Sequence, residues 1–321
     1  MLIRMGIGPY TARPRREAAV AALACLAAAL ACLAATALIA LPGGASASQR
    51  LHPNAAPQRG EAAKVAAYWT VARRLATAPL DAPAGAALTA RVSFAPIAES
   101  TQPPYAVNGR LFVRQGRHQG ACSATAIDSP SRRLVLTAAH CVNSGPRGRR
   151  GSSAWSRYLQ FVPAYTNGTA PFGAFVAGRN AVFAPRQWVK FGNPNFDVGA
   201  ILVAPNAEGV NVADAVGGAT ILIDQPRRQS FQSFGYPRKA RALQGCESPY
   251  VGDDNLTYRL PGPPTIAIRC HWAPGASGGG WLTQEGAAIN GLTSYGKQRD
   301  RVHTFGPYFS ARNVGNLVAG L

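Results

Sequence analysis

The sequence predicts an all-β fold for residues 105–321. Three observations lead to this prediction. Short apolar runs recur from Tyr105 onward, and Gly, Pro, Asn or Asp separates them. The chain contains 34 Gly and 25 Pro, which is typical of many turns between short strands. Its hydrophobic content of 47%, with only 15% charged residues, excludes a chain that is disordered throughout.

The apolar runs give the individual strands that we expect. None recurs at a fixed period, so the sequence does not indicate a solenoid. Only one apolar segment is long enough to span a bilayer, and it lies near the amino terminus, so a multi-span membrane protein is not indicated. The predicted strands are Leu111–Val113, Ala124–Ile127, Leu134–Leu136, Val198–Val203 and Thr220–Ile223.

Residues 1–47 have the layout of a secretory signal peptide. Four arginines precede an uncharged apolar run over residues 18–41, and alanines at positions 45 and 47 fit cleavage before Ser48. The same run could cross a membrane if it is not cut. We therefore expect a secreted or extracytoplasmic protein, which would be membrane-anchored if the leader is retained.

Residues 48–104 differ in texture from the rest of the chain. They are rich in Ala and Pro, include a helical pattern around 61–77, and show no sustained strand alternation. We interpret them as a propeptide or linker. We then expect any catalytic or binding residues to lie within residues 105–321.

The chain is strongly basic. Its 33 Lys and Arg against 14 Asp and Glu give +19, and +16 remains after the four arginines and Glu17 of the leader are removed. This positive net charge predicts a weak attraction to anionic surfaces, which decreases as the salt concentration rises. The basic residues are scattered, without an aromatic-interleaved motif, so no specific nucleic-acid partner is expected. We expect a monomer.

Four cysteines follow the leader: Cys122, Cys141, Cys246 and Cys270. An even number in an exported chain predicts two disulfides, and the count leaves three pairings open. Neither a C-x-x-C motif nor a histidine cluster is present, so no metal site is expected.

Three residues carry the chemistry that the sequence indicates. His140 follows the apolar run 134–136 and precedes Cys141, which suits a fixed general base. Asp197 stands at the start of the run 198–203, where its carboxylate could orient an imidazole. Ser277 lies among small residues in Gly275–Gly280, which permit a tight turn that exposes its hydroxyl. Taken alone, a histidine or aspartate in such a position more often has a structural role, and the serine segment could be a flexible loop. The combination in the order His, Asp, Ser is the informative feature.

The segments Thr137–Cys141 (TAAHC) and Gly275–Gly279 (GASGG) resemble the two signature motifs of the chymotrypsin-like serine proteases. The resemblance extends from about Gly109 to the end of the chain. Further matches to the bacterial glutamyl endopeptidase-like branch are Cys122–Thr125 (CSAT), Phe234–Pro237 (FGYP) and Cys270 ahead of the serine motif.

This resemblance implies two six-stranded Greek-key β-barrels with the active site in the cleft between them. It implies a triad of His140, Asp197 and Ser277, and an oxyanion hole formed by the backbone N–H groups of Gly275 and Ser277. The expected activity is hydrolysis of polypeptides through an acyl-enzyme intermediate, with no metal or organic cofactor. It also suggests pairing Cys122 with Cys141 and Cys246 with Cys270.

Two departures from the digestive-protease pattern affect activation and specificity. Ala276 replaces the Asp that would receive a newly cut amino terminus, so any restraint by residues 48–104 must act differently, for example by covering the cleft or assisting folding. The segments that resemble pocket-forming positions contain no acidic residue, which disfavours a preference for Lys or Arg. His271 could favour an acidic substrate side chain, whereas Trp272 could line the pocket or pack in the core. The expected pocket residues are His271, Trp272, Thr293, Ser294, Tyr295 and Gly296.

Two other classes of function fit parts of the sequence. One is a noncatalytic protease-fold binding protein that uses its basic surface. The other is a membrane-tethered structural or adhesion protein anchored by residues 18–41. Intact His140, Asp197 and Ser277 favour the serine-type endopeptidase.

Overall fold

The structure is a computed structural model that describes residues 59–81, 94–146, 153–238 and 240–321. The leader, with its predicted signal peptide or anchor, lies outside these residues. No helix of the described part is long and apolar enough to cross a membrane.

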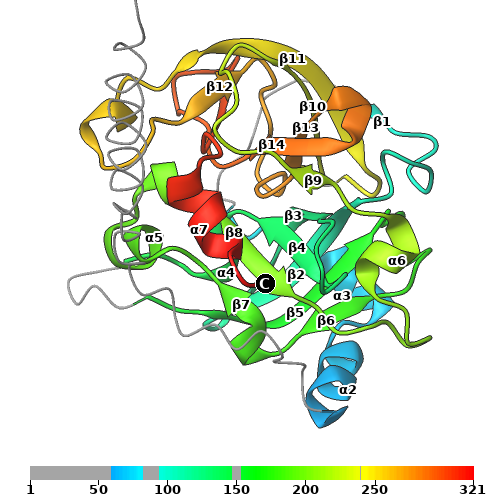
Figure 1. Ribbon diagram of the computed structural model, residues 1–321. Coiled ribbons are helices and arrows are strands. Elements are labelled where there is room, and N and C mark those ends of the chain that lie inside the picture. Colours follow the sequence, from blue (N-terminus) through cyan, green and yellow to red (C-terminus); the bar gives the residue numbers. More distant parts are fainter. Residues whose placement is uncertain (1–58, 82–93, 147–152, 239) are drawn as a thin grey trace, which may run out of the picture. The chain divides into compact units, whose positions relative to one another are not determined.

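The described residues form two antiparallel-rich sheets, which Figure 1 shows one above the other. The predicted all-β class is therefore confirmed, and the helices between the strands are short. Every predicted strand overlaps an observed one. Each sheet also contains two- or three-residue strands that the apolar pattern does not indicate.

The first sheet has the order β6-β5-β2-β3-β4-β8-β7. Strands β4 and β8 pair antiparallel from Leu134↔Leu202 to Thr137↔Gly199, so the end of β4 lies opposite the start of β8. The strands are β2 (Asn108–Gln115), β3 (His118–Ala126), β4 (Leu134–Thr137), β5 (Ser156–Pro163), β6 (Phe175–Ala177), β7 (Val182–Phe183) and β8 (Gly199–Leu202).

The second sheet has the order β15-β12-β11-β10-β13-β14-β9, and β1 also pairs with β11. Its long strand β11 pairs with β10 on one side and β12 on the other. The strands are β1 (Ala95–Pro96), β9 (Thr220–Ile221), β10 (Ser230–Gly235), β11 (Gln244–Asp253), β12 (Ile266–Ile268), β13 (Gly280–Thr283), β14 (Ala288–Leu292) and β15 (Thr304–Gly306).

The helices cap the sheets and connect their strands. Helix α7 near the carboxyl terminus lies beside β8. The α-helices are α2 (Arg59–Tyr68), α3 (Val71–Ala76), α4 (Ala139–Val142), α5 (Arg186–Phe191), α6 (Val212–Val216) and α7 (Asn316–Val318). Single turns of 3-10 helix are η1 (Arg179–Ala181), η2 (Pro194–Phe196), η3 (Thr257–Arg259) and η4 (Gln284–Gly286), and η5 (Ala311–Gly315) is a π-helical turn.

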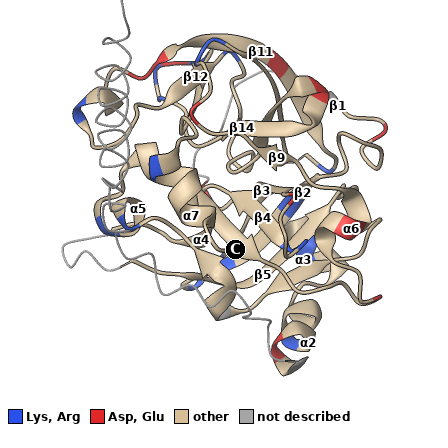
Figure 2. Cartoon of the chain, viewed as in Figure 1, with Lys and Arg blue, Asp and Glu red and all other residues tan. Residues whose placement is uncertain are grey.

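The amino-terminal helices α2 and α3 cover the predicted helical stretch and pack on the first sheet. Trp69, between them, is only 2% exposed, and its ring lies 5.4 Å from that of Phe112 on β2. Its indole N–H donates to the carbonyl of Tyr158. Figure 2 shows basic residues on α3 and on the adjoining part of β2. This part of residues 48–104 is therefore integrated with the sheet.

Two disulfides join segments near the predicted site. Cys122 on β3 bonds to Cys141 on α4, and Cys246 on β11 bonds to Cys270. Both predicted pairings are confirmed. Such bonds are typical of proteins that fold in an oxidising compartment.

Candidate active site

Strands β4 and β8 bring His140 and Asp197 together. Because Thr137 pairs with Gly199, the chain leaving β4 and the chain entering β8 lie at the same edge of the sheet. His140 lies three residues beyond β4, on α4, and Asp197 ends the turn η2 just before β8. The two apolar runs seen in the sequence form β4 and β8, and the pairing of these strands brings the side chains of His140 and Asp197 together.

The Asp197 carboxylate is 2% exposed and is held by several donors. Its Oδ1 accepts the backbone N–H of His140 at 2.8 Å, and its Oδ2 lies 2.8 Å from His140 Nδ1. The Ser294 hydroxyl also donates to Oδ2. Burial alone would raise the pKa of Asp197, but attraction to His140 and these hydrogen bonds outweigh it, so the pKa is lowered. An ionised Asp197 fixes the proton on Nδ1 of His140, which leaves Nε2 as the basic nitrogen.

Ser277 lies in the turn that precedes β13. Gly275 in this turn has φ of +98°, a conformation that favours glycine, and an added Cβ would lie 2.7 Å from the carbonyl oxygen of Tyr236. Ser123 on β3 contacts the turn twice: its N–H donates to the Ser277 carbonyl at 2.8 Å, and its hydroxyl donates to the Gly275 carbonyl at 2.9 Å. A strand of the first sheet therefore positions a turn of the second.

A carboxylate that the sequence analysis did not single out lies at this turn. Asp81 Oδ1 accepts the Gly275 N–H at 2.8 Å, and the Ser277 hydroxyl donates to Asp81 Oδ2 at 2.6 Å. Asp81 belongs to residues 48–104, the predicted propeptide or linker. A lone Asp in an Ala- and Pro-rich stretch carries no sequence signal of such a contact.

A cavity of about 410 Å³ opens beside His140 and Asp197, and two of the six expected pocket residues, Ser294 and Tyr295, line it. The cavity is lined further by Trp188, Gly192, Pro194, Asp254, Leu256, Thr257, Leu260 and Lys297. Sequence reasoning did not indicate Asp254, which lies far from the pocket segments along the chain. The Lys297 ammonium lies 2.7 Å from this carboxylate and neutralises it.

The other expected pocket residues lie elsewhere around the site. Trp272 is 6% exposed, its ring stacks 4.0 Å from that of Phe94, and its indole N–H donates to Ser233. Core packing is therefore the role that its contacts support. His271 is half-buried, and its Nδ1 has no hydrogen-bond partner among the described residues.

Thr293 and Gly296 differ in exposure. The Thr293 hydroxyl accepts the indole N–H of Trp281 at 3.0 Å, and its backbone carbonyl accepts the N–H of Gly278. These contacts bury Thr293 and tie it to the serine turn. Gly296 is exposed.

Among the described residues, the one group of potential metal ligands is formed by His140 with Cys122 and Cys141. The two sulfur atoms are bonded to each other, so they provide no thiolate. The donor set therefore does not suit a metal ion.

Comparison with protein-family models gives no match, and comparison with curated protein sequences gives none either. Solved structures do match. The chain is similar to the protease Anisep from Arthrobacter nicotinovorans, with 29% identity and a TM-score of 0.57, over 64% of this chain and 90% of that one. It is also similar to the thermostable serine protease AL20 from an extremophilic microorganism, with 27% identity and a TM-score of 0.58, over 66% of this chain and 95% of that one.

A Glu endopeptidase has a TM-score of 0.56 and 17% identity, over 71% of this chain and 97% of that one. At this identity the match concerns the fold. These similarities extend to most of the length of each solved structure.

Proposed function

Since the chain has the fold of the chymotrypsin-like serine proteases, including that of the glutamyl endopeptidase branch, we propose that it is a secreted serine endopeptidase that hydrolyses polypeptides. The observation that carries the proposal is the arrangement around Asp197. Its buried carboxylate holds both the backbone N–H and the ring Nδ1 of His140, as a general base requires. The two disulfides agree with folding outside the cytosol.

In the proposed reaction, the Ser277 hydroxyl oxygen attacks the carbon of a peptide carbonyl, and His140 takes the hydroxyl proton. Asp197 stabilises the imidazolium that forms. The carbonyl oxygen becomes an oxyanion that accepts the N–H groups of Gly275 and Ser277. The carbon–nitrogen bond then breaks, and the leaving amine takes the proton from His140. Water, deprotonated by His140, hydrolyses the resulting ester and restores the Ser277 hydroxyl.

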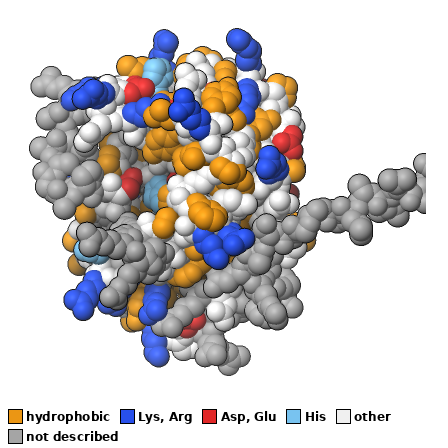
Figure 3. All heavy atoms as spheres, turned by 90° about the vertical axis from the view of Figure 1, so that its left-hand side faces the viewer, with side chains coloured by type: hydrophobic (Ala, Val, Ile, Leu, Met, Phe, Trp, Pro, Cys, Tyr) orange, Lys and Arg blue, Asp and Glu red, His pale blue; other side chains and the backbone are white. Residues whose placement is uncertain are grey.

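A noncatalytic binding protein with a basic surface is the alternative. Figure 3 shows one face of the molecule, on which basic side chains lie singly among apolar and neutral ones. This dispersion gives little support to a dedicated anion-binding surface on that face. The hydrogen bonds around Asp197 favour the enzyme instead.

The test is prolonged labelling of the secreted protein with a fluorophosphonate probe, with casein hydrolysis followed in parallel. We expect peptide mapping to find the adduct on Ser277, and Ser277→Ala to abolish both signals. A folded protein that acquires no adduct after prolonged incubation would instead support the noncatalytic binding protein.

A further inference from the structure

The segment that follows helix α3 crosses from the first sheet to the serine turn. Arg74 in the last turn of α3 is buried, and its guanidinium donates to the carbonyl of Gly168 at 2.9 Å and to the side chain of Gln160 at 3.3 Å. Thr77 ends α3 in an extended conformation. The chain then runs to Asp81, whose carboxylate contacts Ser277. The segment is therefore fixed at both ends.

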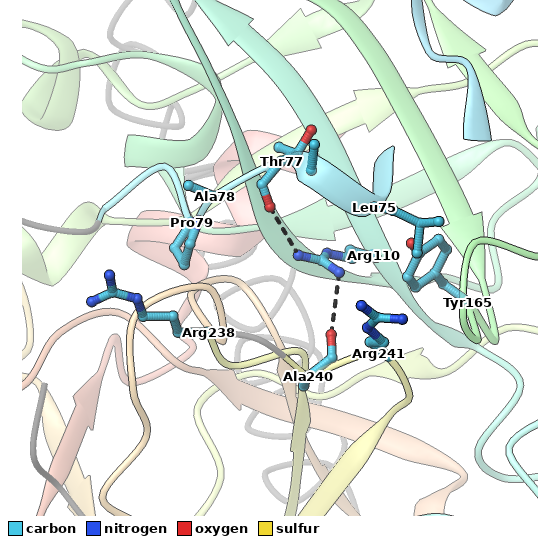
Figure 4. A pocket seen from close by; sticks show the side chains of 10 residues that line it. Leu75, Thr77, Ala78, Pro79, Arg110, Tyr165, Arg238, Ala240 and Arg241 are labelled. Atoms are coloured by element: carbon cyan, nitrogen blue, oxygen red, sulfur yellow. Dashed lines mark hydrogen bonds between the residues drawn. The ribbon is translucent and has the colours of Figure 1, made fainter. Parts of the chain in front are cut away.

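A cavity of about 420 Å³ lies beside this segment, and Figure 4 shows Arg110 between Thr77 and Ala240. Arg110 on β2 is 5% exposed. Its guanidinium donates to the Ala240 carbonyl at 3.2 Å, and its other terminal nitrogen lies 3.4 Å from the Thr77 carbonyl. Arg110 thus connects the segment to both the first sheet and the loop before β11.

The middle of the segment adds to an edge of β3. The Leu80 N–H donates to the Ala121 carbonyl at 3.0 Å, and the Ala121 N–H donates to the Ala78 carbonyl at 2.9 Å. This is a parallel bridge, a short form of strand addition. Gly120 permits the close approach, because a Cβ added there would lie 2.6 Å from the Leu80 Cα, and its three nearest atoms would all belong to Leu80.

We propose that residues 77–81 are an autoinhibitory segment whose Asp81 carboxylate occupies the oxyanion site of the serine endopeptidase. This inference rests on the proposed function. The oxygen of a substrate carbonyl must accept the N–H of Gly275, and Asp81 Oδ1 already accepts it. The Ser277 hydroxyl donates to Asp81 Oδ2, so the same carboxylate also holds the nucleophile.

The chemistry of the contact explains why the segment inhibits without being consumed. Asp81 presents a carboxylate to Ser277, and the delocalised negative charge of a carboxylate makes its carbon a poor target for a nucleophile. The hydrogen bonds from Gly275 and Ser277 are also charge-assisted, which makes them stronger than those that a neutral peptide carbonyl accepts. The segment is therefore a competitive ligand rather than a substrate.

The first experiment measures the rate of fluorophosphonate labelling of the full chain, after intact-mass analysis confirms that residues 59–81 are attached. We expect Asp81→Ala to label about 10- to 100-fold faster than the wild type, because two charge-assisted hydrogen bonds are lost. Glu61→Ala, which removes a carboxylate from α2 in the same amino-terminal region, should label at the wild-type rate.

A second variant tests the segment without changing the carboxylate. Gly120→Ala should clash with Leu80 and displace the segment. The small fluorophosphonate probe does not bind along β3, so the substitution should not hinder its reaction with Ser277. We expect faster labelling and faster hydrogen–deuterium exchange of residues 78–81 and 118–122. Asp81→Ala should increase the same exchange.

The outcomes separate this inference from the proposed function. If exchange increases in both variants while the labelling rate stays at the wild-type value, the segment docks but does not inhibit, and the inference is wrong although the enzyme remains. If exchange does not change in either variant, the docking itself is wrong. If no form of the chain ever acquires an adduct on Ser277, the proposed function fails and the inference fails with it.

Discussion

Ser294→Ala should destabilise the fold in a pH-dependent way. The Ser294 hydroxyl donates to Asp197, whose carboxylate is 2% exposed, so water cannot readily replace the lost donor. A hydrogen bond to a charged group contributes about 1.5–3 kcal/mol. We therefore expect the free energy of unfolding at pH 7 to fall by about that amount.

The sign of the pH dependence follows from the lowered pKa of Asp197. Burial opposes that lowering, and the interactions with His140 and Ser294 produce it. A carboxyl with a lowered folded-state pKa stabilises the fold above its unfolded value of about 3.9, and this contribution is lost as pH falls through the folded value. Ser294→Ala removes one of the groups that lower the pKa. Its cost should therefore be complete at pH 7 and smaller near pH 3.

The assay is guanidinium denaturation at both pH values in a Ser277→Ala background, which prevents self-digestion. Ser233→Ala is the matched control, because its hydroxyl is also buried but accepts its hydrogen bond from a neutral group, the indole N–H of Trp272. Its cost should be the same at both pH values. An equal cost of Ser294→Ala at pH 7 and pH 3 would refute the assigned role of its hydroxyl.

Three further changes test other parts of the structure. Asp197→Asn should lower kcat by about 10⁴-fold with little change in KM, as in the chymotrypsin triad, and steady-state kinetics on a peptide substrate would expose a smaller effect. Replacing both Cys246 and Cys270 by Ser opens a loop with a sequence separation of 24 and should cost about 3 kcal/mol in equilibrium denaturation; a cost below about 1 kcal/mol would contradict this. Trp69→Ala should cost about 3–5 kcal/mol in a single transition if α2 and α3 unfold together with the sheets, and two separate transitions in calorimetry would show that they do not.

The sequence predicted strands whose apolar residues are contiguous, and it missed strands whose stability comes from pairing. Strands β4 and β8 are buried at every position and read as apolar runs. Strand β11 instead contains Gln, Glu, Ser and Pro, and is only partly buried over most of its length. Its extended conformation depends on the register with β10, from Ser230↔Pro249 to Gly235↔Gln244. Local residue preferences do not encode that pairing.

The sequence motifs predicted a pairing of His140 and Asp197, which are hydrogen-bonded although 57 residues apart. Two other polar groups acquire their roles only from the fold. Ser294 was expected to line a pocket, and it also donates to Asp197. Asp81 reaches Ser277 across 196 residues. A single Ser or Asp has no pattern around it that would indicate such a partner.

Ser123 and its neighbour Cys122 give strand β3 a particular place in the evolution of this chain. Ser123 binds the Ser277 turn through hydrogen bonds from its N–H and its hydroxyl, and Cys122 is bonded to Cys141, the residue after His140. One strand thus sets the positions of groups from both sheets. If two related proteins exchanged a complete sheet by recombination, the hydrogen bonds between β3 and the serine turn would have to be preserved. Strands that do not touch β3 could change without altering the spacing of the reacting groups.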